Sequence, residues 1–124
     1  MAILDGVKIL VVDDEDALRD ILVDEFECEG AEADSAENGE AALERIRINS
    51  YDFVITDVRM PVMDGVEMLK AVVSELGETR PQIILLSGYT DVSQQEAIEL
   101  GALDLMEKPW DMDELLEKIE NSRK

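Results

Sequence analysis

The 124-residue sequence contains no histidine, and this absence excludes several kinds of site. Without histidine the chain cannot build a Ser-His or Cys-His nucleophile pair, or a histidine metal site, from its own residues. Its one cysteine, Cys28, cannot form an internal disulfide, which predicts a reducing, cytoplasmic location. We expect Cys28 to serve as a small apolar residue of the core.

Basic residues are also scarce. Eleven Lys and Arg face 31 Asp and Glu, so the formal net charge is −20. Phosphate backbones and anionic membranes repel such a surface, and we therefore expect no direct contact with nucleic acid or membrane. No apolar run approaches the ~20 residues of a membrane helix, and the N-terminus lacks the pattern of a signal peptide. A carboxylate site for a divalent cation is compatible with this composition.

Short apolar runs alternate with amphipathic segments along the whole chain. Strands are predicted over residues 7–12, 32–35, 51–56, 83–86 and 102–106. Helices are predicted from Asp16 to near Gly30, from Gly39 onward, over 65–76 and 92–100, and from Asp111 onward. Five strand-helix units in series predict an α/β fold with a doubly wound, five-stranded parallel sheet. We see one domain, residues 1–124, without a linker or repeat.

Two of these helices allow more specific expectations. In the first, Asp16 is expected to cap the helix, with Leu18, Ile21, Leu22 and Phe26 facing the core. In the last, Asp111 is expected to cap a helix whose residues Leu115, Leu116 and Ile119 point inward. Trp110 should pack where that helix begins.

Polar side chains stand where four of the strands end. Asp13 and Asp14 follow the first strand, Asp57 the third, Ser87 the fourth and Lys108 the fifth. In an open parallel sheet the carboxyl ends of the strands share one edge, and ligands bind there. Three neighbouring carboxylates repel one another, and a divalent cation relieves this repulsion. One of them could then attack a phosphoryl group, with Lys108 and Ser87 contacting its oxygens.

The same residues carry a resemblance to a known family. VVDDED (11–16), DVRMPVMDG (57–65), LLSGY (85–89) and EKPW (107–110) resemble the receiver domain of two-component response regulators. The resemblance implies a CheY-like, flavodoxin-like fold with strand order 2-1-3-4-5. It also implies phosphotransfer from a sensor histidine kinase or a histidine phosphotransfer protein, in a chain that catalyses only its own phosphorylation and dephosphorylation.

Residue by residue, the resemblance implies a role for each strand-end group. Asp57 matches the phosphoacceptor, Asp14 a direct Mg²⁺ ligand and Asp13 the acid that holds a metal-bound water. The backbone carbonyl of Arg59 matches the third protein ligand. Ser87 matches the switching hydroxyl, and Lys108 matches the lysine that pairs with the phosphoryl group. The side chains of Arg59 and Tyr89 flank the phosphoryl position.

One position departs from the family pattern. Three residues before Lys108 the family usually carries a Tyr or Phe that turns inward on activation, and here that residue is Leu105. We therefore expect a muted response at the fifth strand. The output surface is predicted to be the fourth helix, fifth strand and fifth helix, contacting a downstream protein, and homodimerisation stays open. We also predict a cis Lys108–Pro109 bond.

Two alternatives come from other functional classes. Leu105 suggests a phosphorylation-independent interaction module of the same fold. The series Asp14-Glu15-Asp16 after an apolar strand also fits the start of a haloacid-dehalogenase-like phosphatase, with Asp14 as nucleophile. That reading leaves DVRMPVMDG unexplained, and replacing Asp57 separates it from a receiver domain.

Overall fold

The computed structural model describes residues 3–88 and 92–123. Five strands form one all-parallel sheet in the order β2-β1-β3-β4-β5, as predicted. The strands are β1 (Lys8–Val12), β2 (Glu32–Ala36), β3 (Phe53–Asp57), β4 (Gln82–Ser87) and β5 (Asp104–Glu107). The helices are α1 (Asp16–Cys28), α2 (Gly39–Ile48), α3 (Gly65–Leu76), α4 (Gln94–Glu99) and α5 (Met112–Ser122), with a 3-10 turn, η1, at Gly77–Thr79.

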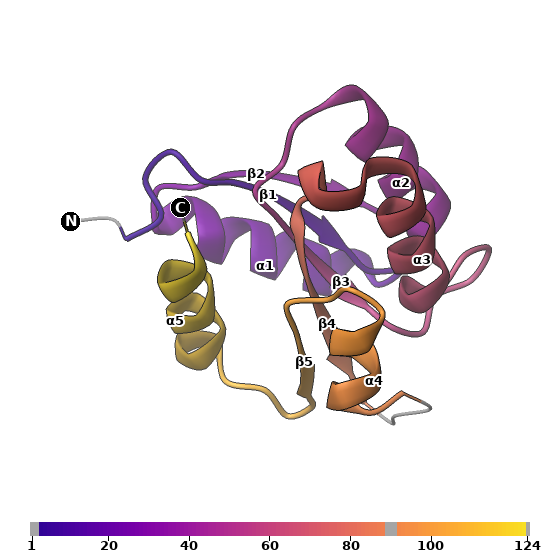
Figure 1. Cartoon of the computed structure of the whole chain (residues 1–124). Helices are drawn as coiled ribbons and strands as arrows, with labels where there is room; N and C mark the ends of the chain where they lie inside the picture. The colour runs from indigo at the N-terminus through magenta and orange to yellow at the C-terminus, as the bar shows by residue number, and fades with distance from the viewer. Residues whose placement is uncertain (1–2, 89–91, 124) are drawn as a thin grey trace.

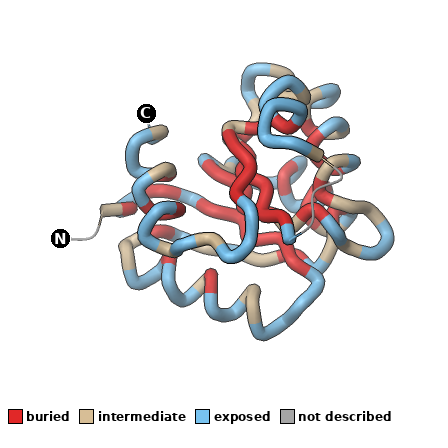
Figure 2. The backbone as a smooth tube through the Cα atoms, turned by 90° about the horizontal axis from the view of Figure 1, so that it is seen from below, coloured by how far each residue is buried: buried red, intermediate tan, exposed pale blue. Residues whose placement is uncertain are grey.

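The helices cover both faces of the sheet, with α1 and α5 on one side and α2, α3 and α4 on the other (Figure 1). Successive residues of a strand point to opposite faces, and the two cores follow this alternation. In β1, Ile9 and Val11 pack toward α1 and α5, whereas Leu10 and Val12 pack toward α2 and α3. Both faces are apolar, so the central strands are buried (Figure 2).

Several local signals act as the sequence predicts. Asn38 caps α2 by accepting a hydrogen bond from the backbone N–H of Ala41, and Asp111 caps α5 through the N–H of Asp113. Leu115, Leu116 and Ile119 are buried, and Trp110 packs against the core beside α1 and α5. The Lys108–Pro109 bond is cis, as predicted. No helix among the described residues is both long and apolar enough to cross a bilayer.

Helix α1 contradicts three of the expectations. Asp16 is its first residue rather than its cap; Glu15 holds the cap position and makes no capping hydrogen bond with its side chain. Ile21 is 58% exposed, and the fully buried side chains of α1 are Leu22 and Phe26. Cys28 is exposed at the end of the helix and is therefore not part of the core. The spacing of apolar residues predicted the position of the helix correctly, but it predicted a wider buried face than the structure has.

Helix α4 is shorter than predicted. It spans Gln94–Glu99, begins at a capping box between Ser93 and Glu96, and buries only Ala97. The prediction of a helix over 92–100 had included its cap and its last turn. With one buried residue, this helix is lightly anchored to the sheet.

Val62, in the loop between β3 and α3, adopts a left-handed conformation with φ of 71° and is 73% exposed. A β-branched residue there is strained, since its Cβ crowds the backbone. Val62→Asn should raise the free energy of unfolding by about 0.5–1 kcal/mol, because asparagine tolerates this region and little packing is lost. Urea denaturation measures the change. A variant less stable than the parent would contradict a strained valine.

Candidate functional site

The sheet brings the predicted strand-end residues together at one edge. Asp57 is the last residue of β3 and Ser87 the last of β4, while Asp13 and Asp14 follow β1 and Lys108 follows β5. One carboxylate oxygen from each of the three acids lies within 4.8 Å of the others. The Lys108 Nζ is 3.7 Å from Oδ2 of Asp57. Residues 95 positions apart in the chain thus share one charged cluster.

Asp13 is the buried member of this cluster, with 3% of its surface exposed. Its Oδ1 accepts a hydrogen bond from the backbone N–H of Glu15 at 2.8 Å, so one oxygen is fixed against the backbone. The pKa of Asp13 is raised to about 6, mainly by burial. The negative charges of Asp57 and Asp14 also raise this pKa, whereas the hydrogen bond from Glu15 and the charge of Lys108 lower it. The geometry therefore holds an acid where its charge is unfavourable without a cation.

Asp57 is half-buried beside it. Burial raises the pKa of Asp57, although Lys108 and the backbone N–H of Val58 act in the opposite direction. That N–H donates to Oδ1 at 2.9 Å, and the ammonium group of Lys108 lies near Oδ2. Each oxygen of Asp57 is therefore oriented by a different neighbour.

The loop from Val58 to Gly65 packs closely against the backbone of Asp57. The backbone N–H of Gly65 donates to the carbonyl of Val58 at 2.8 Å, and Asp64 forms a capping box with Glu67 at the start of α3. A Cβ on residue 65 would lie 2.3 Å from the carbonyl oxygen of Asp57. Glycine is thus required here because the first turn of α3 approaches the end of β3 closely.

Strand β5 brings Lys108 to the site through its pairing with β4. Ser87 pairs with Glu107, and the backbone N–H of Lys108 donates to the carbonyl of Ser87 at 2.7 Å. Ser87 is buried, whereas the Lys108 side chain is 39% exposed. Ser87 and Lys108 therefore stand side by side at the ends of adjacent strands, and the ammonium group of Lys108 reaches Asp57.

The donor set fits Mg²⁺. All three side chains offer carboxylate oxygens, the ligands that hard cations prefer, and among the described residues no cysteine joins the group. Arg59 lies two residues after Asp57 in the exposed loop, where its carbonyl was predicted to be a further ligand. Tyr89, predicted to flank the phosphoryl position, lies outside the described residues.

A second polar cluster, absent from the predictions, joins α4, β5 and α5. The buried Asp104 accepts hydrogen bonds from Nε2 of Gln94 at 2.6 Å and from the N–H of Leu105 at 2.8 Å. The Nζ of Lys118 lies 2.6 Å from its other oxygen. Burial opposes ionisation of Asp104, but Lys118, Gln94 and the Leu105 amide outweigh it and lower the pKa of this carboxyl. An aspartate in an apolar strand, with a lysine on the next helix, was the available sequence signal.

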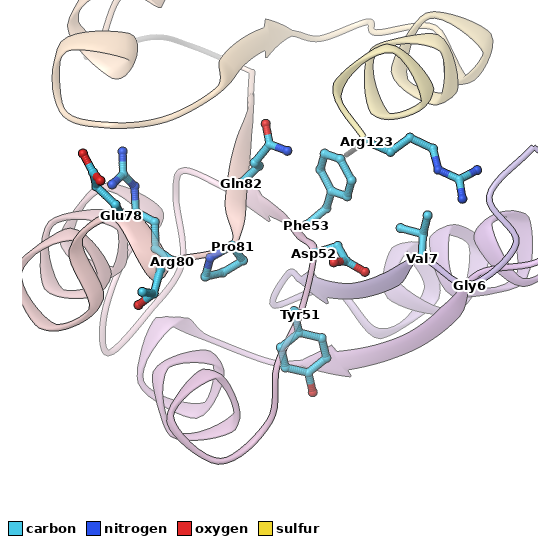
Figure 3. A pocket seen from close by; sticks show the side chains of 11 residues that line it. Gly6, Val7, Tyr51, Asp52, Phe53, Glu78, Arg80, Pro81, Gln82 and Arg123 are labelled. Atoms are coloured by element: carbon cyan, nitrogen blue, oxygen red, sulfur yellow. The ribbon is translucent and has the colours of Figure 1, made fainter.

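A cavity of about 340 Å³ lies at the opposite edge of the sheet, where strands begin (Figure 3). Val7, Asp52 and Gln82, which stand at or just before the starts of β1, β3 and β4, border it. The guanidinium of Arg80 donates to the carbonyls of Gly77 and Gly101, and that of Arg123 to those of Ile3 and Asp5. These cations already stabilise the backbone, and the cavity includes no residue of the strand-end cluster.

The strand order, and the cluster of polar residues at the carboxyl ends of the strands, define a doubly wound, flavodoxin-like α/β protein. The family model described as "Response regulator receiver domain" matches residues 9–120. The chain therefore belongs to the receiver domains of two-component response regulators. Receiver domains generally are signalling modules that bind Mg²⁺ and interact with histidine kinases or phosphotransfer proteins. The family match removes the support for the phosphatase alternative.

Individual relatives agree with this assignment. Sporulation initiation phosphotransferase F of Bacillus subtilis is 35% identical over 113 residues, which cover 90% of each chain. Regulatory protein AtoC of Escherichia coli is 43% identical over 109 residues, which cover 87% of this chain but 23% of AtoC. The chain thus spans under a quarter of that relative's length. The response regulator TrrA of Thermotoga maritima, solved in complex with Mg(2+)-BeF, superposes with a TM-score of 0.82 at 36% identity, over 93% of this chain and 97% of TrrA.

Proposed function

We propose that Asp57 accepts a phosphoryl group from a phosphohistidine of a sensor histidine kinase or histidine phosphotransfer protein. The observation that carries this proposal is the convergence of Asp13, Asp14 and Asp57, with Lys108 3.7 Å from the Asp57 carboxylate. A carboxylate oxygen of Asp57 attacks phosphorus, the P–N bond to the partner's imidazole breaks, and that nitrogen keeps the bonding electrons. Hydrolysis of the resulting acyl phosphate returns Asp57 and inorganic phosphate.

The other strand-end residues hold charge and orientation in this scheme. Asp13, Asp14 and Asp57 would hold Mg²⁺ together with the carbonyl of Arg59, and the ion would neutralise charge on the phosphoryl oxygens. Lys108 supplies a positive charge to one phosphoryl oxygen, and the hydroxyl of Ser87 donates a hydrogen bond to another. Residues 1–124 act in this proposal as one receiver domain in the cytoplasm, whose only chemistry is its own phosphorylation and dephosphorylation.

Acetyl phosphate tests the proposal without a known kinase. The protein is incubated with Mg²⁺ and acetyl phosphate, and its intact mass is measured. We expect a single phosphate adduct that requires Mg²⁺ and disappears with time after the donor is removed. A protein that acquires no adduct at saturating Mg²⁺ and donor would contradict the proposal.

A phosphorylation-independent interaction module is the second candidate, and the burial of Leu105 favours it. Leu105 is 4% exposed and packs in the core between the sheet and α4. The residue at the switch position is therefore buried without phosphorylation. Its neighbour Asp104 joins Gln94 of α4 to Lys118 of α5. Asp104 thus links the three elements of the α4-β5-α5 face, and in both candidates this face contacts a downstream protein.

The predicted consequence is a muted response at β5. Beryllofluoride, a phosphoryl mimic, should shift the amide resonances around Asp57 and Ser87 strongly and those of Leu105 and α5 less. A ligand changes a conformation only through its different interactions with two states, and a buried leucine has no second position to offer. Leu105→Tyr should enlarge the response of β5. Shifts at Leu105 equal to those at Ser87 in the parent protein would show that the switch is not muted.

A further inference from the structure

Arg19 of α1 links the first helix to the end of β1. Its side chain is largely buried, with 15% exposed. One guanidinium nitrogen, Nη1, donates to the backbone carbonyl of Asp13 at 2.6 Å, and Nη2 donates to Oδ1 of Asp16. We propose that Arg19 is a positioning residue of the cation site, which aims the carboxylate of Asp14 by fixing the backbone before it. This inference rests on the proposed Mg²⁺ site.

Two peptide planes flank Asp14, and a hydrogen bond holds each of them. The carbonyl of Asp13 lies in the rigid plane that leads into Asp14, and Arg19 holds that carbonyl. The N–H of Glu15 lies in the plane that leaves Asp14, and it donates to Oδ1 of Asp13. Asp13 is itself anchored, because its N–H donates to the carbonyl of Ala36 at 3.2 Å. Asp14 therefore sits between two anchored planes although its own side chain is exposed.

The planar guanidinium of Arg19 can hold two acceptors at once. Asp16, on the first turn of α1, orients one nitrogen while the other reaches back to the Asp13 carbonyl. A lysine ammonium is a point charge and does not hold two acceptors in one fixed geometry. Without Arg19, the Asp13–Asp14 peptide can rotate. Binding of a cation must then order Asp14, and the entropy lost in doing so lowers the affinity for the cation. Groups that orient metal ligands in this way typically contribute 10–100-fold to metal affinity.

The test compares Arg19→Met with a matched arginine elsewhere. Methionine keeps an apolar stem of similar length and removes the hydrogen bonds. Arg47→Met is the control, because Arg47 makes two bonds to Glu75 at 2.8 and 2.7 Å across α2 and α3, away from the site. Mg²⁺ is titrated without any phosphodonor while amide shifts are followed. We expect Arg19→Met to raise the Mg²⁺ Kd about tenfold and Arg47→Met to leave it unchanged.

Further readouts separate positioning from simple destabilisation. Arg19→Lys, which keeps the charge, should share the weaker Mg²⁺ affinity, and Asp16→Asn should show a smaller change in the same direction. Labelling by acetyl phosphate should need more Mg²⁺ in Arg19→Met but reach the parent rate at saturation. If Arg19→Met does not fold, the lysine variant decides. A folded Arg19 variant with the parent Mg²⁺ Kd would overturn the inference.

The two proposals fail separately. If the parent protein binds Mg²⁺ but Asp57 is never labelled, the phosphoacceptor role is wrong and the role of Arg19 is still measured by the metal titration. If the parent is labelled normally and Arg19 variants bind Mg²⁺ as the parent does, only the positioning role is wrong.

Discussion

Asp57→Asn should abolish phosphate labelling by acetyl phosphate while the protein keeps its fold. The amide is similar in shape to the carboxylate and still accepts the hydrogen bond that Val58 donates to Oδ1. It lacks the anionic oxygen that attacks phosphorus, so the expected loss is complete rather than partial. Intact mass after incubation with Mg²⁺ and donor measures the adduct.

Asp52→Asn is the control for that experiment. Asp52 immediately precedes the same strand, β3, but lies at the opposite edge of the sheet and is exposed. This variant should be labelled like the parent protein. A phosphate adduct that survives in Asp57→Asn would reject Asp57 as the acceptor, and its location at Asp14 would revive the phosphatase alternative.

Asp13→Asn should make the protein more stable at pH 7 in the absence of metal, by about 2 kcal/mol. Burial and the neighbouring acids raise the pKa of Asp13 from 3.8 to about 6. Between these values the folded state binds more protons than the unfolded state, so stability falls as the pH rises through this window. One pKa unit equals about 1.4 kcal/mol, and ionised Asp13 therefore costs the fold up to about 3 kcal/mol. Asparagine removes this cost and still accepts the Glu15 hydrogen bond.

Urea denaturation with a chelator present measures this prediction. The parent protein should gain about 1 kcal/mol or more on going from pH 7 to pH 5, and Asp13→Asn should gain less. Asp24→Asn, at an exposed position of α1, controls for the change in net charge. Mg²⁺ should stabilise the parent at pH 7 more than Asp13→Asn. If Asp13→Asn were less stable than the parent at pH 7 without metal, the ionised carboxylate of Asp13 would not destabilise the folded state.

The elements that sequence analysis located well are those with strong local signals. The β-branched run before Asp13 predicts a strand buried on both faces, and β1 pairs with both β2 and β3. Gly65–Leu76 was predicted with its observed bounds, because Asp64 and Gly65 mark its start and Gly77 its end. Helix α4 was placed less well, since polar residues dominate it and its apolar period is weak.

Side-chain burial was predicted less well than the positions of the helices and strands. The apolar period of α1 includes Ile21, yet only part of that stripe contacts the sheet, and Ile21 and Cys28 remain exposed. A helical period indicates which residues share a face, but neighbouring elements decide how wide a stripe they cover. The contacts of Asp104 with Gln94 and Lys118 likewise depend on the relative positions of three elements.

The sequence by itself determined which edge of the sheet carries the site and which residues are delivered there, because in a parallel sheet every strand ends at the same side. The strand order, which the observed sheet confirms, followed from the family resemblance. Tertiary structure alone decided the chemistry of each residue at that edge. Asp13 and Asp14 are adjacent in sequence, yet one is buried with a raised pKa and the other is exposed. Arg19 reaches Asp13 only because α1 folds back beside β1. Burial, distance and hydrogen bonding are properties of the packed chain, and they set how strongly each carboxylate holds a proton or a metal ion.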